Sequence, residues 1–341
     1  MTPASFTIPL FCLGAAVAAE PVTADNPFAT PIVLKPAGEA VTAPPAADSA
    51  PVTPVAGRWQ AGVRLRAGYD SNFRLLPSEF DPPADESTGS VAGQLQGSLG
   101  YQHPLAPAWT VGGRLHAQAD LYTESGDYDL AQFGGGANAR WSDRRTAVSL
   151  AAAHSVWLLD GDDAVAATGV SLGASRILTD RWSGLILAEW QHLDYDERDD
   201  ASGDLLALRA QPWFLPAGND PQRRIEGELR VATYRAEQDW ASYTAVRPGL
   251  GGRWRLHPAA VDRDLDLHGA IQVEIRSYDE AAPGAAEAED AVLLQLDADA
   301  VLWLKSWLGV GAYAAFQQRA SNLDDRDYDR IQTGVQLLGR W

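Results

Sequence analysis

From residue 57 onward, apolar and polar residues alternate with a period of two in one segment after another. In the first segment the apolar face runs from Trp59 to Tyr69, and the polar face carries Arg64, Arg66 and Asp70. This pattern is typical of a strand with one apolar and one polar face. The segment is longer than most strands of soluble proteins and suits a tilted strand that crosses a membrane. The pattern recurs over residues 91–102, 109–121, 265–276 and 292–302.

The links between these segments are of two kinds. Short links rich in turn residues lie at 103–107, 142–145, 179–181, 216–223, 257–264 and 305–306. More acidic and often longer links lie at 76–89, 124–129, 160–166, 196–203, 236–241, 279–290 and 321–327. Six turns and seven loops require fourteen strands, with both barrel ends on the side of the turns. The sequence therefore predicts an all-β fold, a transmembrane antiparallel up-and-down β-barrel of about 14 strands.

Aromatic residues favour the membrane barrel over a soluble β-sandwich. They lie near predicted strand ends, where an interfacial girdle requires them: Trp59, Trp109, Trp141, Trp182, Trp254 and Trp307. The last segment alternates from Ile331 to the terminal Trp341. This ending resembles the sorting signal of outer-membrane barrels, with Trp in place of the usual Phe. The resemblance implies an outer-membrane location and the barrel assembly machinery as a partner during insertion.

The N-terminal part of the chain has a different character. Residues 1–19 predict a signal peptide, because an apolar stretch ends in the small residues Ala16-Val17-Ala18-Ala19. Residues 20–56 are rich in Pro and Ala and predict an extended periplasmic linker, available to a periplasmic partner. The barrel then occupies residues 57–341. No later stretch is apolar for long enough to form a transmembrane helix.

Composition excludes several classes of function. The chain has 45 acidic and 27 basic residues and a formal charge of −18. This charge argues against nucleic acid as a partner. The one cysteine, Cys12, excludes a disulfide framework and a cysteine-based zinc site. The remaining expected partners are outer-membrane lipid and lipopolysaccharide, whose phosphates the acidic loops could bridge through divalent ions.

A short motif ends the first predicted strand. The stretch Gly68-Tyr69-Asp70-Ser71-Asn72 resembles the barrels of surface lipoprotein assembly modifiers and related barrels of bacterial polymer export. In that family a fourteen-stranded barrel follows a periplasmic tetratricopeptide domain. Here only the Pro-rich linker stands before the barrel, which weakens the inference of lipoprotein translocation.

Catalytic and metal-binding groups are sparse. The best acid–base candidate is the pair His192 and Asp194, two residues apart near a rim, and no Gly-x-Ser-x-Gly motif is present. Acidic clusters at 160–163, 194–200 and 324–327 could bind calcium but lack the spacing of a known calcium loop. We therefore expect no enzyme activity, no cofactor and no metal, with an outer-membrane hydrolase as the least favoured alternative.

The polar faces together predict the lining of the lumen. The candidate lumen residues carry both signs of charge: Arg64, Arg66, Arg114, Asp120, Arg140, Glu226, Glu228, Arg230, Glu274, Arg276, Asp297 and Asp299, with Glu189, Asp266 and Arg340 on the same faces. Separated charges would line a wet route for a hydrophilic solute, polymer or polypeptide. Paired charges would instead brace a closed lumen, which leaves the barrel as a scaffold for binding or for assembly of surface proteins.

Overall fold

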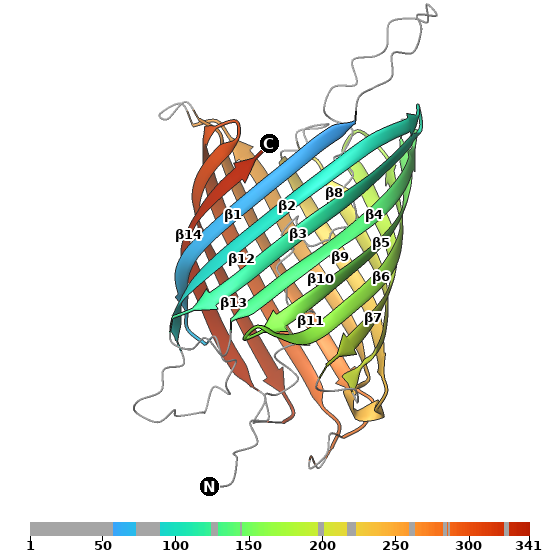
Figure 1. Cartoon of the computed structure of the whole chain (residues 1–341), viewed down its shortest axis with the longest axis vertical. Coiled ribbons are helices and arrows are strands. Elements are labelled where there is room, and N and C mark those ends of the chain that lie inside the picture. Colours follow the sequence, from blue (N-terminus) through green and yellow to red (C-terminus); the bar gives the residue numbers. More distant parts are fainter. Residues whose placement is uncertain are drawn as a thin grey trace, which may run out of the picture.

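The computed structural model describes residues 57–72, 89–123, 129–143, 145–196, 201–216, 223–258, 263–281, 285, 287–323 and 327–341. They form one closed antiparallel barrel in which β14 pairs with β1 (Figure 1). The strands are β1 (Arg58–Asp70), β2 (Ser90–Ala106), β3 (Trp109–Tyr122), β4 (Leu130–Ser142), β5 (Thr146–Leu159), β6 (Asp162–Ile177), β7 (Trp182–Tyr195), β8 (Gly203–Phe214), β9 (Arg223–Ala236), β10 (Tyr243–Leu256), β11 (Leu265–Tyr278), β12 (Asp290–Lys305), β13 (Leu308–Ser321) and β14 (Tyr328–Arg340).

The strand count and the closure confirm the predicted fold class. The signal peptide and linker predicted over residues 1–56 lie outside the described residues. Within the described part of the chain, no helix is long and apolar enough to cross a membrane. A 3-10 turn, η3 (Asp239–Ala241), lies between β9 and β10.

The barrel has an apolar exterior and a largely polar interior. On β1, the outward Val63 and Leu65 are exposed, whereas the inward Arg64 and Arg66 are partly buried and Asp70 is fully buried. A soluble protein would bury the apolar face of such a strand. A lipid-facing exterior removes the apolar side chains from water instead.

A belt of exposed apolar side chains surrounds the barrel. On the turn side it is bounded by outward aromatics that pack in pairs, with ring centroids 4.7 Å apart for Trp59 and Tyr101 and 5.0 Å apart for Trp182 and Phe214. Ten residues along β8 from Phe214, the outward face becomes polar at Asp204. With ~3.4 Å per residue and a tilt of about 40°, this spacing gives the ~25 Å apolar band of outer-membrane barrels.

One predicted loop is a tight turn. Asp160 and Gly161 both have positive φ, 52° and 88°, and connect β5 directly to β6. Two left-handed residues in succession are typical of a type I′ hairpin turn, which the sequence Asp-Gly favours. The loop predicted over 160–166 is therefore too long, because the residues from Asp162 onward belong to β6.

On the turn side, a side chain stabilises the β4–β5 connection. The carboxylate of Asp143 accepts hydrogen bonds from the backbone N–H groups of Arg145, at 2.7 Å, and Thr146, at 2.6 Å. These two bonds hold the pKa of the Asp143 carboxyl below its ordinary value. Asp143 and Arg145 are exposed to solvent, as a short link outside the membrane requires.

The first and last strands close the ring without a bulge. β1 pairs with β14 from Gly62 opposite Arg340 to Asp70 opposite Gln332. At the turn side, Ala61 and Trp341 exchange two backbone hydrogen bonds, each of 2.9 Å. The ring therefore has no free edge, which a strand in lipid could not tolerate.

Candidate functional site

All the candidate lumen residues lie on the inward face of the wall, in register across the strands. Direct cross-strand partners include Arg66 with Gln94 and with Gln336, Arg253 with His268, and His268 with Asp299. Glutamine recurs on this face: Gln94, Gln96, Gln118, Gln132, Gln191, Gln211, Gln272, Gln295, Gln332 and Gln336. The lumen is therefore lined by amides as well as by charges.

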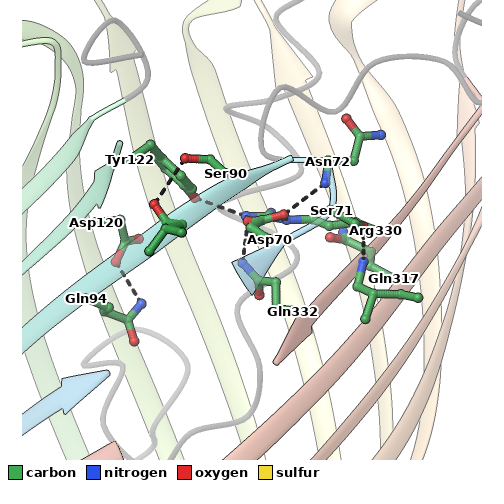
Figure 2. A network of polar contacts seen from close by, with 12 residues as sticks. Asp70, Ser71, Asn72, Ser90, Gln94, Asp120, Tyr122, Gln317, Arg330 and Gln332 are labelled. Carbon is green, nitrogen blue, oxygen red and sulfur yellow. Dashed lines mark hydrogen bonds and ion pairs between the residues drawn. The ribbon is translucent and has the colours of Figure 1, made fainter. Parts of the chain in front are cut away.

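A buried ion pair joins the first and last strands at the loop side. Figure 2 shows Asp70 facing Arg330, whose Nε lies 3.0 Å from both carboxylate oxygens. Asp70 also accepts from the side-chain amide of Gln332 at 2.8 Å and from the backbone N–H of Asn72 at 3.2 Å. Arg330 donates in addition to the hydroxyl of Tyr122 at 3.1 Å. We call these five residues the seam clasp.

Other residues of the Gly-Tyr-Asp-Ser-Asn motif also connect β1 to β14. Ser71 accepts a hydrogen bond from the backbone N–H of Ile331 at 2.8 Å, and the side chain of Asn72 donates to the carbonyl of Asp329 at 3.0 Å. A Cβ on Gly68 would collide with the carbonyl of Thr333, so only glycine allows this close approach of β1 to β14. The motif thus joins the first strand to the last, a role that the alternation of apolar and polar residues does not predict.

Two chains of hydrogen bonds each lead from an arginine to the carboxylate of Asp120. In the first, the side chain of Arg66 donates to Gln94 at 3.4 Å, and Gln94 donates to Asp120 at 2.7 Å. The second passes from Arg64 through Gln96 and Gln118 to the same carboxylate, with amide links of 2.8 and 3.0 Å. Each amide accepts from the positive side and donates to the negative side. The arrangement fixes the glutamines and compensates the inward charge.

A second charged group lies on β7 to β11. Arg209, Arg230 and Arg247 are direct cross-strand neighbours on β8, β9 and β10. Such a row of like charges is unfavourable by itself. It is compensated by carboxylates of the same wall, since Arg247 lies 3.1 Å from Glu228 and Arg209 lies 3.6 Å from Glu189.

Next to this row, Glu274 and Arg276 form an ion pair in which both side chains are buried. The guanidinium of Arg276 also stacks over Tyr243, 4.3 Å from the ring centroid. Most of the predicted lumen charges of this wall are therefore neutralised locally.

Inward side chains near the loop-side ends of the strands are mostly buried. On every strand except β3, at least one inward side chain near the loop-side end is buried. From β5 to β9 these side chains form an apolar cluster that we call the loop-side core: Trp157, Val165, Ala167, Leu193, Tyr195, Ala201, Leu205, Ala207, Ala232, Tyr234 and Ala241. A polar lumen was expected on nearly every strand, and this sector differs because large apolar side chains alternate inward there.

The turn-side half is different in charge and in pairing. Within four positions of the turn-side strand ends, the inward face carries what we call the turn-side arginines: Arg58, Arg140, Arg224, Arg253, Arg255 and Arg340. Among the described residues, the inward carboxylates at this level are Glu226 and Asp266, and they pair with Arg224 and Arg255. Asp266 also accepts from the indole N–H of Trp303 at 2.7 Å.

The acid–base candidate does not form a catalytic site with its sequence neighbour. His192 and Asp194 both point outward, and Nδ1 of His192 lies 3.0 Å from Asp204 on β8, on the outer surface. The inward His116 packs over Gly134, whose missing side chain leaves room for the imidazole. No cluster of three or more metal-ligating side chains occurs among the described residues. The candidate clusters at 197–200 and 324–326 lie outside them.

Comparisons with known proteins agree with this geometry. A family model described as surface lipoprotein assembly modifier matches residues 87–313. No curated protein sequence matches the chain.

Solved structures that match most of the chain do so at low identity and with TM-scores below 0.5. A bacterial polysaccharide outer membrane secretin is 11% identical, with 83% of this chain and 98% of that chain covered and a TM-score of 0.42. An anion-selective porin from Comamonas acidovorans is 9% identical, with 84% and 99% covered and a TM-score of 0.47. A loop-deleted OmpT, an outer membrane protein of Vibrio cholerae, is 9% identical, with 84% and 100% covered and a TM-score of 0.46.

The matched segment is well over half of the chain and falls within the barrel. The apolar belt and the closed ring place this barrel in the outer membrane. The chain therefore belongs to the surface lipoprotein assembly modifier family and is an outer-membrane β-barrel.

Proposed function

We propose that the barrel provides a polar route by which a hydrophilic polypeptide reaches the cell surface, and that this route is closed at the loop side at rest. The supporting observation is the difference between the two halves of the lumen. The loop-side ends of β5 to β9 carry the eleven residues of the loop-side core, whereas the buried apolar cluster near the turn-side ends is smaller, Leu185, Leu187 and Trp213, and lies beside inward arginines. Fourteen strands enclose more space than the ~8 whose side chains fill a barrel unaided. The description of the family favours a polypeptide as the molecule that passes.

A non-conducting scaffold for surface-protein assembly is the second candidate. The same loop-side core favours it, because a permanently packed end offers no passage. The two candidates differ in what happens when this packing is loosened. A gated route opens, whereas a scaffold merely loses stability.

The test is single-molecule current in planar bilayers with the full chain. We expect small, infrequent openings from the parent, and larger and longer ones from the double variant Tyr195→Ala/Leu205→Ala, which truncates the loop-side core. The matched control is Leu185→Ala, which truncates a buried side chain near the turn-side end of β7. Absence of current from folded parent and folded core variant alike would favour the scaffold.

A further inference from the structure

The turn-side arginines are a set of inward cations that exceeds its local carboxylates. Six arginines face two carboxylates, in a chain whose overall charge is −18. An acidic protein that gathers cations in one part of its lumen creates a local field opposite in sign to that of its surface. Such a field attracts anions into that part of the lumen.

Arg140 and Arg253 are the partly buried members of this set that lack a paired acceptor, whereas Arg58 also lacks one but is exposed to solvent. In the described part of the chain, neither side chain has an ion pair or a side-chain hydrogen bond. The Nε of Arg140 is buried and lacks a hydrogen-bond partner, as do the Nε atoms of five other inward arginines, but each of those five has an ion pair or a further hydrogen bond through its guanidinium. A buried guanidinium donor without an acceptor is costly, unless a ligand supplies the acceptor.

At the loop side, by contrast, inward arginines are paired. Arg330 contacts Asp70, Arg276 contacts Glu274, and Arg319 contacts Glu289. The same chain therefore neutralises its arginines in one half and leaves some of them uncompensated in the other. A purely structural role for the arginines would not explain this difference.

Topology spreads the uncompensated cations around the lumen. Arg140 lies on β4 and Arg253 on β10, six strands apart in a ring of fourteen, so they face the lumen from nearly opposite sides. A single small anion cannot reach both walls of so wide a barrel. An extended chain with several acidic groups can.

We propose that the turn-side arginines bind an acidic polypeptide segment that enters the lumen from the periplasm. Guanidinium groups bind carboxylates through paired, charge-assisted hydrogen bonds, which supply the acceptors that Arg140 lacks. The choice of a polypeptide rests on the proposed function. The binding itself does not require conduction, so it can succeed or fail independently of the current measurements.

The experiment is calorimetric titration of the full chain in detergent micelles with poly-L-glutamate of about twenty residues. We expect binding that weakens as salt is raised. The double variant Arg140→Gln/Arg253→Gln should bind about tenfold more weakly, equivalent to the loss of ~1.4 kcal/mol. The matched control is Arg176→Gln, because Arg176 is exposed on the outward face near the turn-side end of β6. It should bind like the parent.

Three outcomes would overturn the proposal. Equal affinity of the parent and the folded double variant would remove these arginines from the site. Tight binding of tripolyphosphate together with no binding of polyglutamate would assign the site to phosphate groups rather than to acidic polypeptide. Poly-L-lysine should not bind, and binding of it comparable to polyglutamate would also contradict the proposal.

Discussion

At the scale of single residues, the two faces of each strand face different surroundings. Leu250 and Thr244 both point outward from β10, but Leu250 is near the middle of the strand and Thr244 is at its loop-side end. A charge at the middle must enter the hydrocarbon layer, whereas a charge at the end reaches the head groups. Identical substitutions at these two positions therefore measure the depth of the apolar belt.

Leu250→Arg should lower the free energy of unfolding by about 2–4 kcal/mol, and Thr244→Arg by about 0–1 kcal/mol. The measurement is reversible unfolding by denaturant in lipid vesicles. Equal costs at the two positions would show that the outward face of β10 is not in contact with lipid. A barrel in detergent should show a smaller difference, because micelles adapt to an inserted charge.

The seam clasp supports a second prediction at this scale. Asp70 is fully buried and holds Arg330, so Asp70→Asn leaves a buried guanidinium without its carboxylate. We expect a loss of about 3–5 kcal/mol in the free energy of unfolding. In the double variant Asp70→Asn/Arg330→Gln the two losses should not add, because each single change removes the same pair. Additive losses in this cycle would contradict the pairing.

At the scale of elements, the β5–β6 hairpin depends on two left-handed residues. Gly161 has φ of 88° and no atom within 4 Å of an added Cβ, so Gly161→Ala is strained only through its backbone. We expect it to destabilise by about 1–2 kcal/mol. Gly93, on the outward face of β2, also has open space around an added Cβ and an ordinary φ, so Gly93→Ala should be nearly neutral. Thermal unfolding measures the loss of stability in each variant. Similar losses in the two variants would exclude a type I′ turn at Asp160 and Gly161.

Features that depend on neighbouring residues in the sequence are predicted well, whereas features that depend on residues far apart in the sequence are not. The alternation of apolar and polar residues is local, and it predicts fourteen strands and the faces of β1, β3, β11 and β12 correctly. The Asp-Gly turn at 160–161 was missed because the aspartates after it look like a loop, although they extend the hairpin. The seam clasp was missed because Asp70 and Arg330 are far apart in sequence, and only closure of the ring brings them together.

The loop-side core shows the same limit. Residues such as Leu193, Tyr195 and Leu205 alternate inward, so an apolar face alone does not reveal whether it meets lipid or the lumen. The alternation pattern assigned charged faces to the lumen, because charged side chains must avoid the hydrocarbon layer. It had no means to assign strands that are apolar on both faces.

At the scale of the whole molecule, the charges of the lumen should set its preference for ions. Asp297 and Asp299 face the lumen on β12, and Asp297 is held by Gln295 at 3.0 Å. In a variant with the loop-side core truncated, Asp297→Asn/Asp299→Asn should shift the preference toward anions, because fixed carboxylates attract cations locally. Reversal potentials in a salt gradient measure this shift. An unchanged potential would place the conducting path away from these residues.

Because β1 and β14 are neighbours, the ring of strands has no first or last member, although the chain does. Because Ala61 and Trp341 are already hydrogen-bonded, a short Gly/Ser linker could join Trp341 to Arg58, and new ends could be opened at Pro107-Ala108 between β2 and β3. Such a circular permutant should refold in detergent to the same barrel, seen as the same heat-sensitive mobility on gels. A permutant that fails to refold would show that the order of the strands along the chain is itself required. Successful refolding would show that the fold depends on which strands are neighbours around the ring and not on which strand comes first along the chain.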